Sequence, residues 1–540
     1  MTFAEALRTR AREAPRELAF TFEDDRLTYE ALWLEASRIA AGLAEARVAP
    51  GERVALLLPA GIDFVRAFAA VALAGAVPFA ISPAVAPATA IGRAARVRPS
   101  AAVVPAARRG ALQVAGSSNA VRLLALEDLA RSEASIAEPP APEPEDPAFL
   151  QLTSGTTGEP RFAVVSHRAL AACLRISNAV FGLGAGDVLA GWVPPWHVMG
   201  LVRFIIFPVL LGVPAHLVPP AVSGLGLWLE TAARVGATFT SAPDFALRSV
   251  TRLVSGRSLD LASLRFLVCG GEPVRSSTIV AFERRFDRPG LVLPAYGLAE
   301  ATLGLTCARP GEPIAVDSTG TVSCGRPFPE IEIEVVDEHG GLLPRGTPGE
   351  ILARSPALFS GYLDDVASET KMRRDGWLAT GDWGRLGETR ELFVLGRRRN
   401  LLKHGGATFA PRELEDAADA IHRVHASAAI SLTHVDRPQV VQVVLVVETT
   451  DPSAPAAVDI AREVAEAVRR GLGILPGEVL LVAPGTMPRT DSGKVRHIEL
   501  KRALAAGELA KGEARFGRFE GWLEEQLADQ PQRGLRGILP

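Results

Sequence analysis

The sequence predicts an α/β protein with a large N-terminal domain of mixed or parallel sheets and helices, residues 1–395, and a smaller α+β domain, residues 396–540. Short apolar runs alternate with helical patterns through most of the chain, which predicts βαβ units and a mostly parallel sheet. From Ile331 the pattern IEIEVVD alternates as a half-exposed strand would. The charged segment Gly396–Asn400 (GRRRN) then marks the domain boundary, because enough elements follow it to build a compact domain.

The expected elements of the N-terminal domain begin with an amphipathic helix over the first 15 residues. Apolar runs predict short buried strands, and one amphipathic pattern predicts a helix. The strands are Arg53–Pro59, Ala101–Pro105, Val121–Leu126, Arg265–Cys269 and Leu291–Pro294, and the helix is Gly61–Ala76. The Glu/Pro/Ala-rich stretch Glu133–Pro147 cannot pack a core and predicts a surface connection.

The C-terminal domain is predicted from the same patterns. Its helices are expected at Pro411–Ala420, Ala456–Arg470 and Phe516–Leu527, and its strands at Ala426–Thr433, Val440–Glu448 and Glu478–Val482.

Composition excludes several classes of protein. With 48% hydrophobic and 22% charged residues, the chain has the balance of a soluble globular protein. A formal net charge of −3 gives no basic excess for nucleic acid. The most apolar stretch, Leu201–Val222, is interrupted by charged residues and prolines, so we expect a buried helix that runs into a strand rather than a membrane span. Four cysteines without CxxC spacing predict reduced thiols and a cytoplasmic location.

The strongest chemical signal is Thr153–Arg161, TSGTTGEPR, between two predicted strands. Glycine lets the backbone approach a ligand closely, and successive N–H groups and hydroxyls can then surround a phosphate. Arg161 adds a fixed cation. The alternative is an ordinary Ser/Thr/Gly loop, and no GK[ST] follows that would make this a Walker loop.

This motif resembles the phosphate-binding signature of the acyl-adenylate-forming superfamily, the AMP-binding enzymes. Further segments are similar to that family in the right order over nearly the whole chain. They are Pro194–Gly200 (PPWHVMG), Gly270–Arg275 (GGEPVR), Ala295–Thr302 (AYGLAEAT), Thr380–Gly384 (TGDWG), the hinge region Gly396–Glu415 and Pro488–Arg496 (PRTDSGKVR).

The resemblance implies ATP and Mg²⁺ as cofactors. It implies that nucleotide contacts come from Thr153, Ser154, Gly155, Thr156, Thr157, Gly158, Arg161, Gly271, Glu272, Pro273, Ala295, Tyr296, Gly297, Leu298, Asp382 and Arg397. Within this set Tyr296 offers a stacking face for adenine, and Asp382 can accept the ribose hydroxyls.

Three residues are implied in catalysis. Glu300 would hold Mg²⁺, which prefers oxygen ligands and bridges phosphates. Lys494 would bridge the acyl carboxylate and the α-phosphate, since a flexible ammonium can reach into a cleft. His197 would guard the acyl tunnel or contact the carboxylate, with Trp196, Met199 and Gly200 lining the acyl pocket. The small domain is expected to swing about Arg398–Arg399.

The motifs most resemble fatty acyl-AMP ligases, which pass the acyl group to the phosphopantetheine of an acyl carrier protein. Three departures bear on this branch. The stretch Thr306–Thr321 is short where such ligases carry an insertion that blocks CoA, Thr408 replaces an arginine of many CoA ligases, and Arg399 stands where the hinge usually has Asp or Lys. The alternatives are therefore a CoA ligase, an aryl-acid ligase and a non-catalytic nucleotide-binding homologue.

Overall fold

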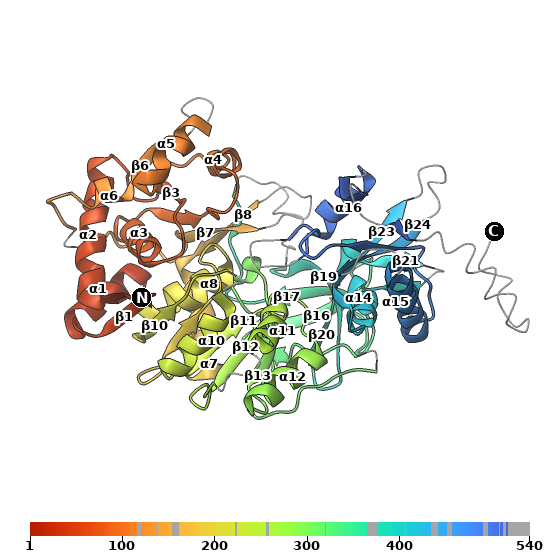
Figure 1. Ribbon diagram of the computed structural model, residues 1–540. Helices are drawn as coiled ribbons and strands as arrows, with labels where there is room; N and C mark the ends of the chain where they lie inside the picture. The colour runs from red at the N-terminus through yellow and green to blue at the C-terminus, as the bar shows by residue number, and fades with distance from the viewer. Residues whose placement is uncertain are drawn as a thin grey trace, which may run out of the picture. The chain divides into compact units, whose positions relative to one another are not determined.

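The computed structural model describes residues 1–115, 121–136, 138–153, 161–221, 224–254, 259–318, 320–363, 375–404, 407–433, 441–450, 456–489, 495–506, 508–510 and 515–516. The chain divides into two compact units (Figure 1). Unit 1 contains Met1–Thr380 and Arg385–Val394, and unit 2 contains Gly381–Gly384 and Leu395–Pro540.

Unit 1 contains a nine-stranded sheet in the order β15-β14-β13-β12-β11-β9-β10-β1-β2. The six strands from β13 to β1 are parallel, and antiparallel strands close both edges. The strands are β1 (Leu18–Phe22), β2 (Asp25–Thr28), β9 (Leu189–Gly191), β10 (Ala215–Leu217), β11 (Phe239–Ala242), β12 (Phe266–Gly270), β13 (Val292–Tyr296), β14 (Thr306–Cys307) and β15 (Arg326–Pro327).

A second sheet of unit 1 has seven strands in the order β18-β8-β7-β4-β3-β5-β6. The strands β7, β4, β3, β5 and β6 are parallel, whereas β8 and β18 run antiparallel to their neighbours. The bounds are β3 (Arg53–Leu56), β4 (Val77–Ala80), β5 (Ala101–Val104), β6 (Leu123–Ala125), β7 (Pro147–Thr153), β8 (Arg161–Ser166) and β18 (Gly361–Tyr362). A four-stranded sheet follows, formed by β16 (Glu332–Val336), β17 (Gly349–Arg354), β19 (Leu378–Leu386) and β20 (Leu392–Arg397).

Helices pack against these sheets because their apolar faces must be buried. Figure 1 shows α10, α11 and α12 beside the nine-stranded sheet. The helices of unit 1 are α1 (Phe3–Glu13), α2 (Tyr29–Glu45), α3 (Ile62–Leu73), α4 (Pro87–Ala95), α5 (Ala106–Ala115), α6 (Leu126–Leu129), α7 (His167–Phe181), α8 (Val198–Leu201), α9 (Phe207–Leu211), α10 (Leu225–Arg234), α11 (Asp244–Leu253) and α12 (Ser276–Phe286). The α/β prediction for the fold is confirmed.

The described part of the apolar stretch Leu201–Val222 folds as predicted from its sequence, as buried helix followed by strand. Between α8 and α9 the chain makes a π-helix, Val202–Ile206, and then enters β10. Among the described residues, no helix combines the length and the apolar character needed to cross a bilayer.

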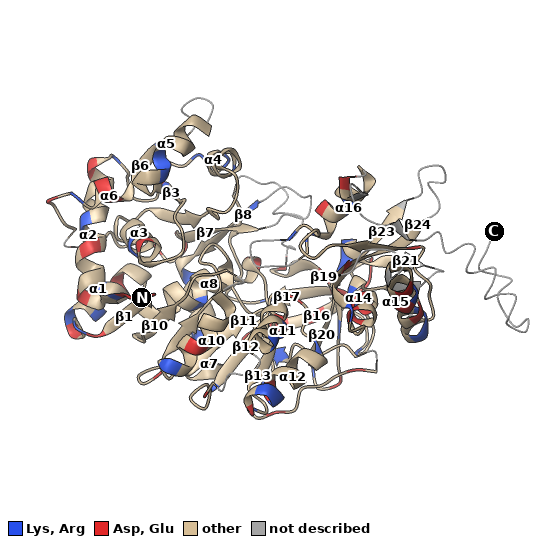
Figure 2. Cartoon of the chain, viewed as in Figure 1, with Lys and Arg blue, Asp and Glu red and all other residues tan. Residues whose placement is uncertain are grey.

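The charge of the molecule is finely mixed. Figure 2 shows acidic and basic residues interleaved along the ribbon rather than gathered by sign. This distribution matches the near balance of 58 basic and 61 acidic residues.

Unit 2 contains a four-stranded sheet in the order β23-β24-β25-β26 and a hairpin of β21 and β22. Its elements are β21 (Leu402–His404), β22 (Ala407–Phe409), α14 (Pro411–Asp419), β23 (Val424–Thr433), β24 (Val441–Thr449), α15 (Ala456–Leu472), β25 (Glu478–Val482), α16 (His497–Ala505) and β26 (Arg515–Phe516). The helix predicted from Phe516 is wrong at its start, since Phe516 pairs with β25 as a strand residue. Residues 517–527 of that prediction lie outside the described residues.

Two buried carboxylates hold the chain on either side of residues 490–494 in unit 2. Glu448 on β24, 1% exposed, accepts backbone N–H bonds from Gly485 and Met487, each 3.0 Å long, and pairs with Arg489 at 2.8 Å. On the other side, the first residue of α16, His497, places Nε2 2.8 Å from Glu415 Oε1. The chain is therefore held to β24 at Arg489, near the start of the PRTDSGKVR motif, and to α14 at His497, directly after its end.

The Glu415–His497 pair makes a pH-dependent contribution to stability. Burial alone would raise the pKa of Glu415 and lower the pKa of His497, but their mutual attraction and hydrogen bond move the two pKa values the opposite way, below 4.5 and above 6.5. Glu415 therefore contributes fully above pH 4.5 and loses its contribution as the pH falls through its lowered pKa. His497 contributes fully below pH 6.5 and loses its contribution as the pH rises through its raised pKa.

We predict that His497→Gln destabilises unit 2 by about 3 kcal/mol between pH 4.5 and 6.5, because it leaves Glu415 buried without its cation. The difference from wild type, measured by thermal unfolding, should narrow as the pH rises beyond 6.5. Glu463→Gln, which breaks the exposed Arg423–Glu463 pair, serves as the control and should have little effect. An equal deficit for His497→Gln at acid and alkaline pH would contradict this account.

Candidate active site

The structure describes both ends of the motif predicted to bind phosphate. Thr153 ends β7, Arg161 begins β8, and the two are paired in the antiparallel register. The Thr153 hydroxyl also donates to the Arg161 carbonyl oxygen at 3.3 Å. The intervening Ser154, Gly155, Thr156, Thr157 and Gly158 lie outside the described residues.

Glu300, predicted to hold Mg²⁺, lies in a short 3₁₀ turn directly after β13 and is 5% exposed. Its carboxylate Oε1 accepts a hydrogen bond from the Tyr362 hydroxyl. The Arg161 guanidinium carbon lies over the ring of the same tyrosine, 5.3 Å from the centre of the Tyr362 ring. Tyr362 therefore brings the predicted metal ligand and the cation of the phosphate motif into one cluster.

The segment 357–362 is fastened to the Glu300 turn at two further points. The Phe359 N–H donates to the Glu300 carbonyl oxygen at 2.8 Å, and the Thr302 hydroxyl donates to the Ala357 carbonyl oxygen at 2.7 Å. Thr302 has φ 61° and ψ −41°, which is strained for a β-branched residue. Strained backbone persists only where neighbouring structure enforces it, and it gathers at binding sites. The turn that presents Glu300 is therefore held in a fixed shape.

The segments predicted to enclose adenine follow the carboxyl ends of two neighbouring parallel strands of the nine-stranded sheet. The parallel strands β12 and β13 place Gly270 opposite Ala295, so GGEPVR and AYGLAEAT leave the sheet side by side. Ligands of α/β sheets bind outside such carboxyl ends. Gly271, Pro273, Tyr296 and Leu298 belong to these two segments.

Two other residues of these segments, Glu272 and Gly297, are constrained by contacts with neighbouring backbone. The Glu272 carboxylate accepts the Phe245 N–H at 2.7 Å, at the beginning of α11. A Cβ added at Gly297 would lie 1.8 Å from the Leu303 carbonyl oxygen, so this turn admits only glycine.

His197 begins α8, and its Nδ1 accepts the Met199 N–H at 3.2 Å. Accepting at Nδ1 places the proton of the neutral ring on Nε2. The preceding Trp196 is tied to β7, because Gln151 Nε2 donates to its carbonyl oxygen at 3.0 Å. The PPWHVMG segment is thus anchored to the strand that carries the phosphate motif.

A narrow cavity of about 20 Å³ follows the PPWHVMG segment. Pro195, Gly200, Phe204 and Ile205 are among its lining residues. Gly200 is among the residues that line this cavity, whereas Trp196 and Met199 are half-buried and do not line it. The walls of the cavity are mainly apolar, and at this volume it has room for about one water molecule rather than for an acyl chain. The predicted acyl pocket itself stays a prediction.

Unit 2 carries Asp382, predicted to accept the ribose hydroxyls, and Arg397, predicted to contact the nucleotide. Asp382 is 5% exposed, and its Oδ1 lies 3.0 Å from Arg397 Nε. Arg398 lies over Trp383, with 6.0 Å between the guanidinium carbon and the ring centre. Lys494 lies outside the described residues.

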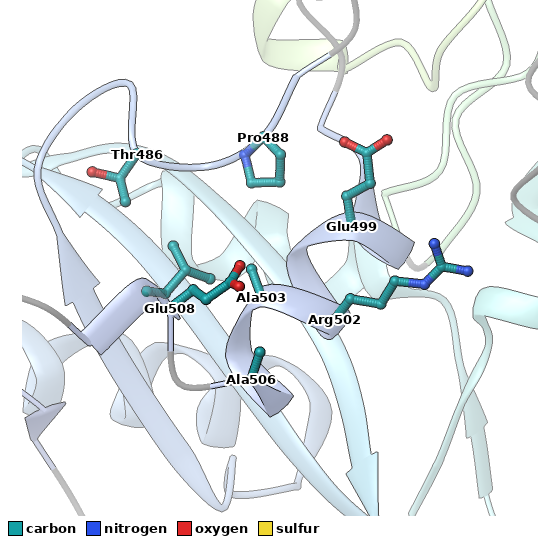
Figure 3. A pocket seen from close by; sticks show the side chains of 8 residues that line it. Thr486, Pro488, Glu499, Arg502, Ala503, Ala506 and Glu508 are labelled. Carbon is teal, nitrogen blue, oxygen red and sulfur yellow. The ribbon is translucent and has the colours of Figure 1, made fainter. Parts of the chain in front are cut away.

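A cavity of about 570 Å³ in unit 2 lies beside the Pro488–Arg496 motif (Figure 3). Thr486 and Pro488 line it from one side, and Glu499 and Arg502 of α16 line it from the other. None of the described residues among those predicted to bind substrate lines this cavity.

The residues at the Glu300 turn fit a nucleotide with its cation. Among the described residues, no group of three or more histidine, cysteine, aspartate or glutamate side chains could enclose a metal. A cation at Glu300 would therefore take most of its ligands from phosphate and water, as Mg²⁺ does in nucleotide sites. The carboxylate supplies the hard oxygen donor, and Arg161 supplies positive charge nearby.

Sequence reasoning missed Tyr362 and Gln151. Tyr362 is one of three tyrosines in the chain, and it lies 62 positions from Glu300. The packing of segment 357–362 against the Glu300 turn and the pairing of β18 with β8 bring the two together. Gln151 could have been found as a polar residue inside the apolar run FLQLT, where a buried amide needs a partner.

Comparison with known proteins bears on the whole chain. Residues 7–363 match the family model described as AMP-binding enzyme. The long-chain-fatty-acid–AMP ligase FadD26 of Mycobacterium marinum is 28% identical over 563 residues, which cover 91% of this chain and 95% of that protein. A Caulobacter vibrioides protein provisionally described as an acyl-CoA synthetase is 29% identical over 528 residues, covering 89% and 91%.

The fold is shared with solved structures. A structure from a study of fatty acyl-adenylate ligases from E. coli and L. pneumophila superposes with a TM-score of 0.85, at 26% identity, covering 94% of this chain and 98% of that one. The family match spans well over half of the sequence and confirms the resemblance drawn from the ordered motifs. The chain belongs to the family of AMP-binding enzymes.

Proposed function

We propose that this AMP-binding enzyme is a ligase that activates a fatty acid. One oxygen of the acid's carboxylate attacks the α-phosphorus of ATP, the bond from that phosphorus to the β-phosphate bridging oxygen breaks, and pyrophosphate leaves. A phosphopantetheine thiol of an acyl carrier protein then loses its proton and attacks the acyl carbon. The carbon–oxygen bond to the phosphate breaks, and AMP leaves.

The observation that carries this proposal is the cluster of Glu300, Tyr362 and Arg161. The reaction brings two anions together, so an enzyme must neutralise and orient them before it needs any other group. Tyr362 orients the buried Glu300 carboxylate, and Arg161 adds a permanent positive charge over the ring of Tyr362. When bound, Mg²⁺ supplies Lewis-acid stabilisation of phosphate charge.

The remaining roles follow the motifs. Asp382 accepts the ribose hydroxyls while Arg397 holds its carboxylate in place. His197, fixed by its bond to the Met199 N–H, presents Nε2–H as a donor at the mouth of the acyl site. Lys494 bridges the acyl carboxylate and the α-phosphate, and unit 2 moves about Arg398–Arg399 between the two half-reactions.

The carrier-protein acceptor is supported by relatives named as fatty-acid–AMP ligases and by Thr408, which replaces an arginine of many CoA ligases. Free CoA is the second candidate acceptor. It is favoured by the short Thr306–Thr321 stretch and by the relative described as an acyl-CoA synthetase.

We predict that the protein catalyses ATP–pyrophosphate exchange with saturated fatty acids and loads a holo-carrier protein in preference to CoA. Lys494→Ala should lower exchange by about 100-fold or more, because one positioned cation at a developing charge contributes several kcal/mol. ATP affinity should stay within a few-fold of wild type, as measured by calorimetry. Full exchange activity in Lys494→Ala would remove the lysine from the mechanism. An absence of exchange with every acid would refute the proposed reaction.

We predict that Tyr362→Phe raises the Mg²⁺ concentration needed for half-maximal ATP binding about tenfold, the effect of one charge-assisted hydrogen bond. Calorimetric titration of ATP at graded Mg²⁺ measures this without turnover. Tyr29→Phe is the matched control, since Tyr29 is 1% exposed and its hydroxyl lies 3.4 Å from the Pro208 carbonyl oxygen, remote from this cluster in the sequence. Equal Mg²⁺ requirements in both variants would show that Tyr362 does not position Glu300.

A further inference from the structure

Arg203 is a cation buried without an anion. It is 4% exposed, and among the described residues its Nε and Nη1 atoms have no hydrogen-bond partner and no carboxylate pairs with it. Burial lowers the pKa of Arg203 to about 10, so the guanidinium stays protonated at neutral pH. A buried charge without a counter-ion is costly, which makes this position unusual in a folded core.

Three phenyl rings around Arg203 stabilise its positive charge only in part. The guanidinium carbon lies 5.4, 5.6 and 5.0 Å from the ring centres of Phe181, Phe207 and Phe239. Aromatic faces attract a cation, but they leave its N–H donors without oxygen acceptors. The side chain therefore has donors in a fixed planar fork that matches a carboxylate.

Arg203 also lies next to the segment predicted to line the acyl pocket. It belongs to the π-helix Val202–Ile206, which begins two residues after PPWHVMG, and such turns occur frequently at functional sites. Its neighbours Phe204 and Ile205 line the narrow cavity together with Pro195 and Gly200. The backbone thus places Arg203 one residue away from the wall of that cavity.

A second set of contacts links Arg203 to the AYGLAEAT segment. Burial raises the pKa values of the Cys173 and Cys307 thiols to about 11 and about 12, while the nearby Arg203 charge acts to lower both. Cys307 lies directly opposite Ala295 in the pairing of β13 with β14. Cys173 in turn forms a hydrogen bond with the backbone of Gly304. Arg203 is therefore close to two cysteines, one of which pairs with the first residue of the AYGLAEAT segment.

We propose that Arg203 binds a second carboxylate at the far end of the acid substrate, so that the natural substrate is an aliphatic dicarboxylic acid. The inference rests on the proposed function and narrows its substrate class. A distal carboxylate supplies the negative charge that the described residues around Arg203 lack. A plain alkyl chain leaves that charge uncompensated, so the enzyme discriminates against it.

The test compares saturated monocarboxylic and α,ω-dicarboxylic acids matched in chain length. Binding is measured by calorimetry with ATP absent, and activity by pyrophosphate exchange. Wild type is expected to bind the best diacid at least about tenfold more tightly than its matched monoacid. A hydrogen bond to a charged group typically changes an equilibrium constant by about this factor or more. Arg203→Met should abolish or reverse the preference, and Arg203→Lys should keep part of it.

Arg265→Met is the control, because Arg265 also lies over a phenyl ring, at 4.8 Å from Phe266, but already has Asp187 as its anion at 2.7 Å. It should keep the wild-type preference. The inference is overturned if wild type prefers monoacids at every length, or if both Arg203→Met and Arg203→Lys keep the wild-type ratio. If diacids bind but no acid causes pyrophosphate release, the proposed reaction is refuted and the diacid site is not. If monoacids are adenylated but diacids do not bind, the diacid site is refuted and the proposed reaction is not.

Discussion

The hydrogen bond between the Tyr362 hydroxyl and the buried Glu300 carboxylate is the constraint on which the proposed site depends. A carboxylate that is 5% exposed is costly unless it is hydrogen-bonded or neutralised. The fold meets this need by running residues 357–362 along the Glu300 turn and adding β18 to the edge of the seven-stranded sheet. The same strand pairing puts Arg161 over the Tyr362 ring, so one contact places a hydroxyl donor on Glu300 and a cation against the same side chain.

The site is assembled where chain segments leave their sheets. The ends of β12 and β13 present GGEPVR and AYGLAEAT together, and the β7–β8 hairpin presents the two ends of TSGTTGEPR. Parallel strands align their carboxyl ends at one edge, which gives several loops a common place to meet a ligand. Buried polar contacts then fix these loops, as Gln151 does for Trp196. The binding groups are therefore organised by backbone geometry before any substrate is present.

Many of the strands and helices could be predicted from the sequence, because each has a local pattern of apolar residues. The run Arg53–Pro59 predicted β3, and the helical pattern of Ala456–Arg470 predicted α15, since buried strands and amphipathic helices differ in apolar period. The helix predicted from Phe516 fails because its first residue pairs with β25, a distant contact that no local pattern records. Tyr362 was missed for the same reason, because its role depends on pairing with Ala163, which lies 199 positions earlier in the chain. Arg203 reads as an interruption of an apolar run, and only the packed structure shows that no carboxylate meets it among the described residues.

The most direct test of the account is the position of a divalent cation bound together with ATP. Crystals of the full chain grown with Mn²⁺ and a non-hydrolysable ATP analogue would locate the metal by its anomalous scattering. The account predicts a peak at coordination distance from the Glu300 carboxylate, about 2.0–2.2 Å, with phosphate oxygens completing the ligand set. A nucleotide-bound Mn²⁺ at any place out of reach of Glu300 would contradict it.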